Sequence, residues 1–200
     1  MKAITIKKTD INSLRDRAYK IACEHGFHDE ELSNKHLLCL VVSELMEAVE
    51  ADRKGKHADV ALFKEWEGNN LPISEETRIR RFKQDFDEFL KGTVEEELAD
   101  TAIRLLDLAG LRGITIEEFP EEMIYESAEL CKRESFTENI YDISTLPSRY
   151  DGIYDFPTTI NDMLFTVFGF AQYLNIDLMW HIEQKMKYNE LRENKHGKRY

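Results

Sequence analysis

The sequence has few cysteines and no long apolar run, and each shortage excludes a class of protein. Its 200 residues contain three cysteines, Cys23, Cys39 and Cys131, which lie far apart and form no Cys-x-x-Cys pair. This usage fits buried thiols in a reducing cytoplasm and argues against a disulfide framework. No segment approaches the roughly 18 consecutive apolar residues of a membrane helix, and the opening MKAITIKKTD lacks the apolar core of a signal peptide. We therefore expect a cytoplasmic protein with no membrane partner.

Positive charge is scarce as well. The chain has 27 basic and 39 acidic residues, a formal net charge of −12. Such a chain repels the phosphates of DNA and RNA, so a nucleic acid polymer is not an expected partner. A free nucleotide carried with Mg²⁺ is compatible with this charge, because the metal offsets the charge of the phosphates. Neither a P-loop nor a G-x-G-x-x-G motif occurs.

Apolar residues recur at helical spacing through nearly the whole chain, which predicts an all-α fold. A length of 200 residues suits a single domain. Asp10, Ser33 or Asn34, and Asp177 are suited to be N-caps, and Gly26 is suited to end the first helix. The expected helices span residues 10–26, 34–55, 75–90, 94–111, 158–174 and 178–192.

Three other segments carry weaker signals. Thr115 to Glu118 has the pattern of a capping box and predicts that a helix begins there. Residues 134–157 are mixed in character and contain Pro147 and Gly152, so we expect a loop. The polar stretch after Gly55 has no helical pattern, and the strand signal is limited to a short segment from Ile4 to Ile6.

Two carboxylates stand where an apolar stripe should continue. In LLCLVVSELMEAVEADRKGK, Glu44 follows the stripe of Leu37, Leu40 and Val41, and Glu47 lies one turn further along. Residues three apart share one face of a helix. A charge in this place marks either the point where the helix emerges into water or a functional cleft.

Glu97 and Asp100 repeat this spacing on the helix expected at 94–111. Four carboxylates from two packed helices would form a compact set of oxygen ligands, which hard divalent cations such as Mg²⁺ prefer. Burying four anions together without a cation would be costly. An exposed surface is the alternative for the second pair, because Glu97, Asp100, Arg104 and Asp107 form one charged stripe of the kind that often faces solvent.

Other metal chemistries fit the sequence less well. Zinc prefers Cys or His ligands, and the Glu-x-x-His spacing of di-iron bundles occurs at Glu193 and His196, in the polar tail. The dipeptide His28-Asp29 also occurs in HD-type phosphohydrolases, although the further metal ligands of that class are not evident here. That hypothesis would make His28 and Asp29 metal ligands.

A basic stretch, KMKYNELRENKHGKRY, closes the chain. Lys185, Asn189 and Arg192 fall at i, i+4 and i+7, on one face of the last expected helix. An ammonium, an amide and a guanidinium suit the binding of a phosphate chain. The alternative is a solvated face whose positive charge favours the C-terminal end of the helix dipole.

Taken together, these motifs resemble the all-α nucleoside triphosphate pyrophosphohydrolases, the MazG-like superfamily that also contains the dimeric dUTPases. The signature of that superfamily is E-x-x-E on one helix and E-x-x-D on the next long one, and here these read ELME and ELAD. The resemblance covers residues 10–56, 93–116 and 175–198. Ser43 replaces the first acid of the fuller E-E-x-x-E form, and residues 117–174 intervene before the closing helix.

The resemblance implies a single all-α domain with elaborations at about 57–92 and 117–174. It implies hydrolysis of a nucleoside triphosphate to monophosphate and pyrophosphate, with Mg²⁺, or Mn²⁺ as a substitute, held by Glu44, Glu47, Glu97 and Asp100. Substrate-binding residues would be Lys185, Asn189, Arg192 and Asp107. It also implies a homo-oligomer, either a dimer or a tetramer. A catalytically silent helical interaction module on the same scaffold is the alternative from another class.

Overall fold

The computed structural model describes residues 5–67, 73–151 and 155–193. Within these ranges the chain folds into nine α-helices and one 3₁₀-helix without a strand, which confirms the all-α prediction. None of these helices combines the length and the apolar character needed to cross a membrane. The elements are α1 Lys8–Glu24, α2 Asn34–Arg53, α3 Val60–Glu67, α4 Glu75–Phe89, α5 Val94–Leu111, α6 Glu121–Cys131, α7 Phe136–Thr145, η1 Leu146–Asp151, α8 Phe156–Tyr173 and α9 Leu178–Glu190.

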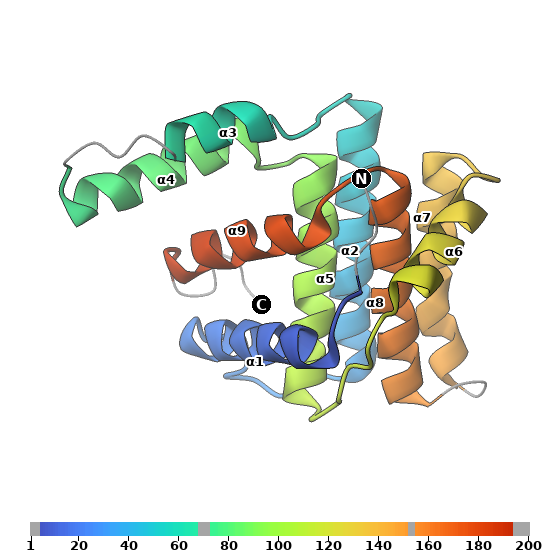
Figure 1. The fold of residues 1–200 in the computed structure, drawn as a ribbon. Helices are drawn as coiled ribbons and strands as arrows, with labels where there is room; N and C mark the ends of the chain where they lie inside the picture. The colour runs from blue at the N-terminus through green and yellow to red at the C-terminus, as the bar shows by residue number, and fades with distance from the viewer. Residues whose placement is uncertain (1–4, 68–72, 152–154, 194–200) are drawn as a thin grey trace.

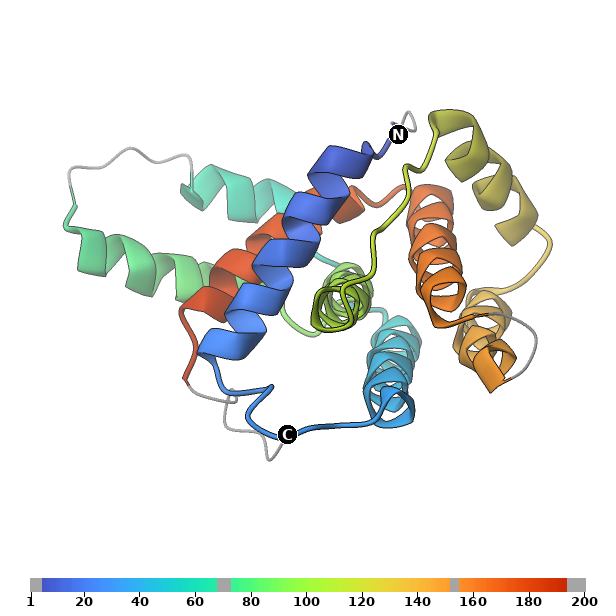
Figure 2. The ribbon, with the colours of Figure 1, turned by 90° about the horizontal axis from the view of Figure 1, so that it is seen from below.

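Helix α5 lies at the centre of the molecule (Figures 1 and 2). It packs against α1, α2, α8 and α9. Its sequence explains this place, because apolar or small residues occupy most of its circumference and eleven of its residues are buried. Two of those eleven are glutamates, Glu96 and Glu97. A central helix that carries buried acids is where a functional site is to be expected.

The predicted helix boundaries are largely correct where a cap defines them. The Ser33 side chain accepts a hydrogen bond from the backbone of His36 at the start of α2, and Asp177 accepts one from the backbone of Trp180 at the start of α9. α1 ends just before Gly26, which has a φ of +74°. The prediction for Asp10 is wrong, because α1 begins at Lys8 and Asp10 lies within its first turn.

The helix predicted to begin at Thr115 does not form there. α6 begins at Glu121, after Pro120, and the preceding residues run extended with Ile116 fully buried. Asn12 of α1 holds this segment, since its side chain donates to the carbonyl of Ile116 at 2.8 Å and accepts from its backbone N–H at 3.0 Å. These bonds replace those that a helix would supply. Of the expected strand, Ile4 lies outside the described residues, and Ile6 forms an isolated bridge with Phe119.

The loop predicted for residues 134–157 is also wrong. α7 occupies Phe136–Thr145, followed directly by η1. A capping box starts α7: the Ser135 side chain accepts from the backbone of Glu138, and the Glu138 side chain accepts from that of Ser135. Ile140 and Ile143 are buried. The Ser-x-x-Glu signal was therefore present in the sequence, but the prolines and glycine further along obscured it.

Helices α3 and α4 form an arm that extends from the rest of the molecule (Figure 1). α3 lies in the stretch for which no helix was predicted. Its residue Phe63 is fully buried, with ring centroids 6.0 Å from Phe82 of α4 and 5.7 Å from Trp180 of α9. One deeply buried aromatic residue can fix a helix of eight residues that has little intrinsic signal. The described residues of the second expected elaboration form α6, α7, η1 and α8, which lie on the opposite side of α5 (Figure 2).

Candidate metal centre and adjoining cavity

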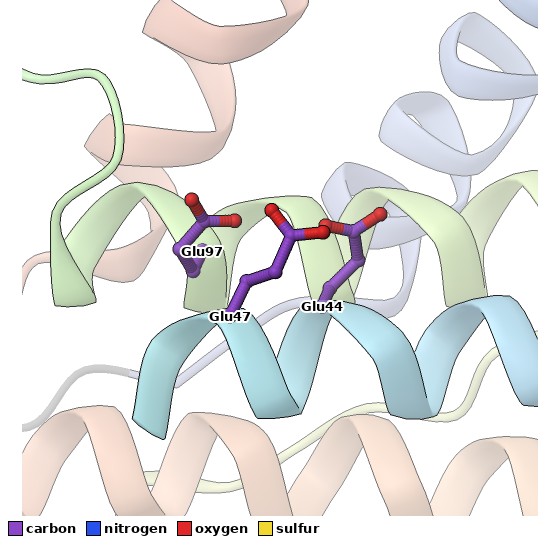
Figure 3. Close-up of side chains that lie close together, drawn as sticks. All are labelled: Glu44, Glu47 and Glu97. Carbon is purple, nitrogen blue, oxygen red and sulfur yellow. The ribbon is translucent and has the colours of Figure 1, made fainter. Parts of the chain in front are cut away.

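Three carboxylates from two neighbouring helices converge on one place (Figure 3). Glu44 and Glu47 extend from α2, and Glu97 extends from α5. One carboxylate oxygen of each residue lies within 4.8 Å of those of the other two. Three of the four acids predicted from the sequence are therefore brought together. Oxygen atoms from carboxylates are the ligands that Mg²⁺ and Ca²⁺ prefer.

Glu44 is buried within the contact between α2 and α5, with 2% of its surface exposed. Val41, Leu45 and Ala48, which surround it on α2, are fully buried. The interrupted apolar stripe of the sequence thus continues around Glu44. Arg104 of α5 donates a hydrogen bond from Nε to this carboxylate, so one cation of the chain fixes the orientation of one acid of the group.

Glu97 has no such cation. It is 7% exposed, and its carboxylate makes no ion pair within the described part of the chain. Burial, followed by the nearby charges of Glu96, Asp100 and Glu47, raises the pKa of Glu97 to about 9. The exposed-surface alternative therefore does not hold for Glu97, because the α5 stripe to which it belongs faces into the molecule at this point.

Asp100 lies outside the group of three and is bonded to Lys185 of α9 instead. The Lys185 ammonium lies 2.8 Å from the Asp100 carboxylate and also donates to Glu96. Burial alone would lower the pKa of Lys185, but Asp100 and Glu96 together raise it above its ordinary value. The sequence assigned Lys185 to a phosphate chain and Asp100 to a metal. The structure places the two side chains against each other, with Lys185 only 4% exposed.

Glu96 is a member of this network that sequence reasoning missed. It is buried, and its second oxygen accepts a hydrogen bond from the backbone of Gly92 at 2.9 Å. The available signal was the run Glu95-Glu96-Glu97, in which Glu96 stands four residues before Asp100 and so shares its helix face. Nothing in the sequence distinguished Glu96 from an acid placed in a first helical turn to favour the helix dipole.

Among the described residues, the acids that converge here outnumber the cations paired with them. The carboxylates are those of Glu44, Glu47, Glu96, Glu97 and Asp100, and the cations are Arg104 and Lys185. Within the described residues neither of these cations forms an ion pair with Glu47 or Glu97, where the carboxylates converge, so the excess negative charge lies there once Glu97 is ionised. A divalent cation bound to Glu44, Glu47 and Glu97 would balance this charge with the oxygen ligands that such ions prefer. The residues present therefore fit a hard divalent metal.

A cavity lies beside the three-carboxylate group, and Asp100 and Arg104 form part of its wall. Its volume is about 90 Å³. Its apolar lining comes from α1, α2, α5 and the connection before α2, and includes Phe27, Leu32, Leu37, Leu40 and Ile103. Its polar lining consists of His28, Asp100, Arg104, Asp107, Asn189 and Arg192. An apolar cavity with a few polar groups, next to an acidic cluster, has the character of a small-molecule site.

Three of the four predicted substrate-binding residues, Asp107, Asn189 and Arg192, line this cavity. Asp107 is bonded to His28, with 2.7 Å between Nε2 and Oδ1. The HD-type alternative requires His28 and Asp29 at the metal, but the three-carboxylate group found among the described residues contains neither of them. The structure places His28 in the wall of the cavity instead.

The pKa of Glu97 predicts that the metal-free protein becomes less stable as the pH rises from 6.5 to 9. In this range the folded protein holds a proton on Glu97 that the unfolded chain, with an ordinary value of 4.5, has released. The free energy of unfolding should therefore fall, by at most about 1.4 kcal/mol per pH unit for one proton. The range starts at pH 6.5 because burial lowers the pKa of His181 from 6.5 to about 4. Below pH 6.5 the unfolded chain binds a proton at His181 that the folded protein does not, so there the stability rises with pH.

Denaturation by urea with a chelator present, at three pH values in this range, measures the slope. Saturating Mg²⁺ should remove the loss, because the cation binds the ionised carboxylates in competition with protons. Glu97→Gln should reduce the slope without metal. A stability that stays constant or rises across the range in the chelated wild-type protein would contradict the assignment of this proton to Glu97.

The chain matches no protein-family model, no curated protein and no solved structure. The case for a function therefore depends on the residues and on their geometry.

Proposed function

We propose that this protein is a Mg²⁺-dependent nucleotide pyrophosphohydrolase, which cleaves a nucleoside triphosphate to the monophosphate and pyrophosphate. The observation that supports this most strongly is the convergence of Glu44, Glu47 and Glu97 beside a cavity with cationic groups in its wall. The acids suit a divalent metal, and Arg104 and Arg192 suit the phosphates that such a metal accompanies. The proposed reaction, cleavage to the monophosphate and pyrophosphate, follows from the resemblance of the sequence motifs to MazG-like enzymes.

The side chains have separate roles in this proposal. Glu44, Glu47 and Glu97 would hold the metal, with Arg104 fixing the orientation of Glu44. When bound, the metal neutralises phosphate charge and lowers the pKa of a coordinated water. A carboxylate of the group that the metal does not fully engage accepts the proton from the attacking water. Lys185 positions Asp100 at the boundary between the acids and the cavity.

Substrate binding is assigned to the cavity. Asn189 lies in the last turn of α9, and Arg192 follows just beyond the end of that helix. Both residues line the cavity and can contact the phosphates, as the sequence predicted. Arg192 lies with its guanidinium 5.8 Å from the ring centroid of Tyr188, which limits its orientations. The apolar side chains Phe27, Leu37 and Leu40 provide a surface for the nucleoside. The expected homo-oligomer stays a prediction.

The proposal is tested by incubating the protein with a panel of ribo- and deoxyribonucleoside triphosphates, with Mg²⁺ or with a chelator. We expect pyrophosphate and a nucleoside monophosphate from at least one member, and only with the metal. ³¹P NMR of the products distinguishes pyrophosphate from inorganic phosphate. Release of inorganic phosphate and a diphosphate would contradict cleavage between the α and β phosphorus atoms.

A variant with all four acids neutralised, Glu44→Gln, Glu47→Gln, Glu97→Gln and Asp100→Asn, controls for contamination by another hydrolase. It should have no activity and should keep the helical circular dichroism of the wild-type protein. Full activity in this variant would refute the proposal.

A catalytically silent interaction module is the second candidate. Exposed apolar side chains on α6 and α7, namely Met123, Tyr125, Leu130 and Tyr141, favour it, since they offer a surface to a partner. The two functions differ in metal binding, which a silent module does not require. Calorimetric titration with Mn²⁺ separates them, because only the enzyme needs stoichiometric binding that the neutralised variant loses.

A further inference from the structure

The wall of the cavity at Asp107 and His28 has the chemistry of a site that selects a nucleobase. Asp107 lies ten residues after Glu97 on the continuous helix α5, which corresponds to about 15 Å along the helix axis. The metal-binding acids and Asp107 are thus separated by a distance over which a nucleotide extends from its phosphates to its base. Asp100 and Arg104, which also line the cavity, lie between them on the same helix.

The Asp107 carboxylate presents a hydrogen-bond acceptor to this cavity. Its Oδ1 is bonded to His28, and in the described residues this is the one hydrogen bond of its side chain. Burial raises the pKa of Asp107, whereas His28 and Arg104 act in the opposite direction. The second oxygen has no hydrogen-bond partner among the described residues, so it is available to a donor from a ligand in the cavity.

Asn189 is an independent indication of a ligand with hydrogen-bond donors. Its side chain is 7% exposed and lines the cavity from α9. Its Oδ1 is buried and has no hydrogen-bond partner among the residues that the structure describes. Buried polar atoms are nearly always paired in folded proteins, so an unpaired acceptor on a residue that lines a cavity indicates a place for a donor.

We infer that the cavity selects a nucleobase that carries an exocyclic amino group, as cytosine, adenine and guanine do, through donation to Asp107. This inference rests on the proposed function and adds a substrate class to it. A carboxylate accepts from an amino group, which is how acidic side chains recognise cytosine in nucleic acids. Uracil and thymine present a carbonyl in place of the cytosine amino group, and hypoxanthine presents a carbonyl in place of the adenine amino group, so two acceptors would face each other and repel. In place of the guanine amino group hypoxanthine carries a hydrogen on carbon, which is no comparable donor.

Matched nucleotide pairs test this directly. The kcat/KM for dCTP is compared with that for dUTP, and those for dATP and dGTP with that for dITP, all with Mg²⁺. In at least one of these comparisons the amino-bearing member should be preferred by roughly 10- to 100-fold, the discrimination expected of one good polar contact to a base. Equal or higher values for dUTP and dITP would overturn the inference and leave the proposed function intact. Hydrolysis of none of them would refute the proposed function itself.

The variant Asp107→Asn separates recognition from a merely structural role. The amide can donate to a carbonyl as well as accept, so the ratio of kcat/KM values within a matched pair should fall to within about threefold. Asp142→Asn, an acid of α7 outside the cavity, should keep the wild-type ratio. If Asp107→Asn lowers activity on all nucleotides alike and leaves the ratio unchanged, Asp107 acts in folding or catalysis and the inference is wrong. Thermal unfolding of the variant identifies any loss of folded protein.

Discussion

Glu97→Gln should lower Mg²⁺-dependent kcat by on the order of 10³-fold and leave the metal-free protein at least as stable as the wild type at pH 8. The activity falls because a neutral amide is a poor ligand for a hard cation, and loss of several kcal/mol of charge stabilisation corresponds to this factor. The stability is kept because Glu97 is buried beside Glu47, Glu96 and Asp100 and forms no ion pair within the described residues, so the folded metal-free protein has to hold a proton on it at pH 8. A neutral amide of the same shape needs no such proton uptake on folding.

Steady-state kinetics and urea denaturation with a chelator measure the two effects. Glu50→Gln is the matched control, because Glu50 lies one turn beyond Glu47 on α2 and pairs with Lys54 on the surface. It should change neither kcat nor stability by a measurable amount. If Glu97→Gln lowered activity and stability together, Glu97 would belong to the fold, and the case for a metal at this site would be lost.

Lys185→Met should destabilise the protein by roughly 3–5 kcal/mol, the usual effect of removing one partner from a buried ion pair. For a chain of this length that lowers the Tm by about 10 °C. The reason is that Glu96 and Asp100 would share a buried site without the ammonium that joins them. Methionine keeps the length of the aliphatic stem, so the change removes charge and not packing.

The same substitution at Lys132, Lys132→Met, breaks an exposed ion pair with Glu129 and should leave the stability almost unchanged. The double variant Lys185→Met with Glu96→Gln should recover part of the lost stability, because it removes one of the two carboxylate charges that the Lys185 ammonium compensates. A stable Lys185→Met protein with a raised KM would instead restore the original assignment of Lys185 to the phosphate chain.

The sequence alone was sufficient for the fold class and for most of the long helices. Helical spacing and local caps are properties of neighbouring residues, so Ser33 and Asp177 could be identified without a tertiary structure. The prediction failed where a distant residue decided the outcome. The segment at Thr115 contains a capping signal, but the side chain of Asn12, more than 100 residues earlier, satisfies its backbone in an extended form.

Glu44, Glu47 and Glu97 were identified as one group from the sequence, because spacing fixes which residues share a helix face and the resemblance placed α2 beside α5. The sequence could not decide which acid receives which cation. Arg104 is paired with Glu44, and Lys185 is paired with Asp100 and Glu96. These pairs depend on how α2, α5 and α9 are positioned along one another where they pack. Charge pairing between helices depends on that packing, which no local pattern encodes.

The amino-acid sequence by itself thus determined most of the long helices, the acidic residue types and their spacing, since these follow from local backbone preferences and from periodicity. Only the tertiary structure decided that Glu97 lies buried with no ion pair among the described residues, that Lys185 pairs with two acids, and that Asp107 and Asn189 line a common cavity. Burial and hydrogen-bond partners are set by contacts between residues far apart in the chain. Those contacts turn a set of surface-like acids into a candidate metal centre.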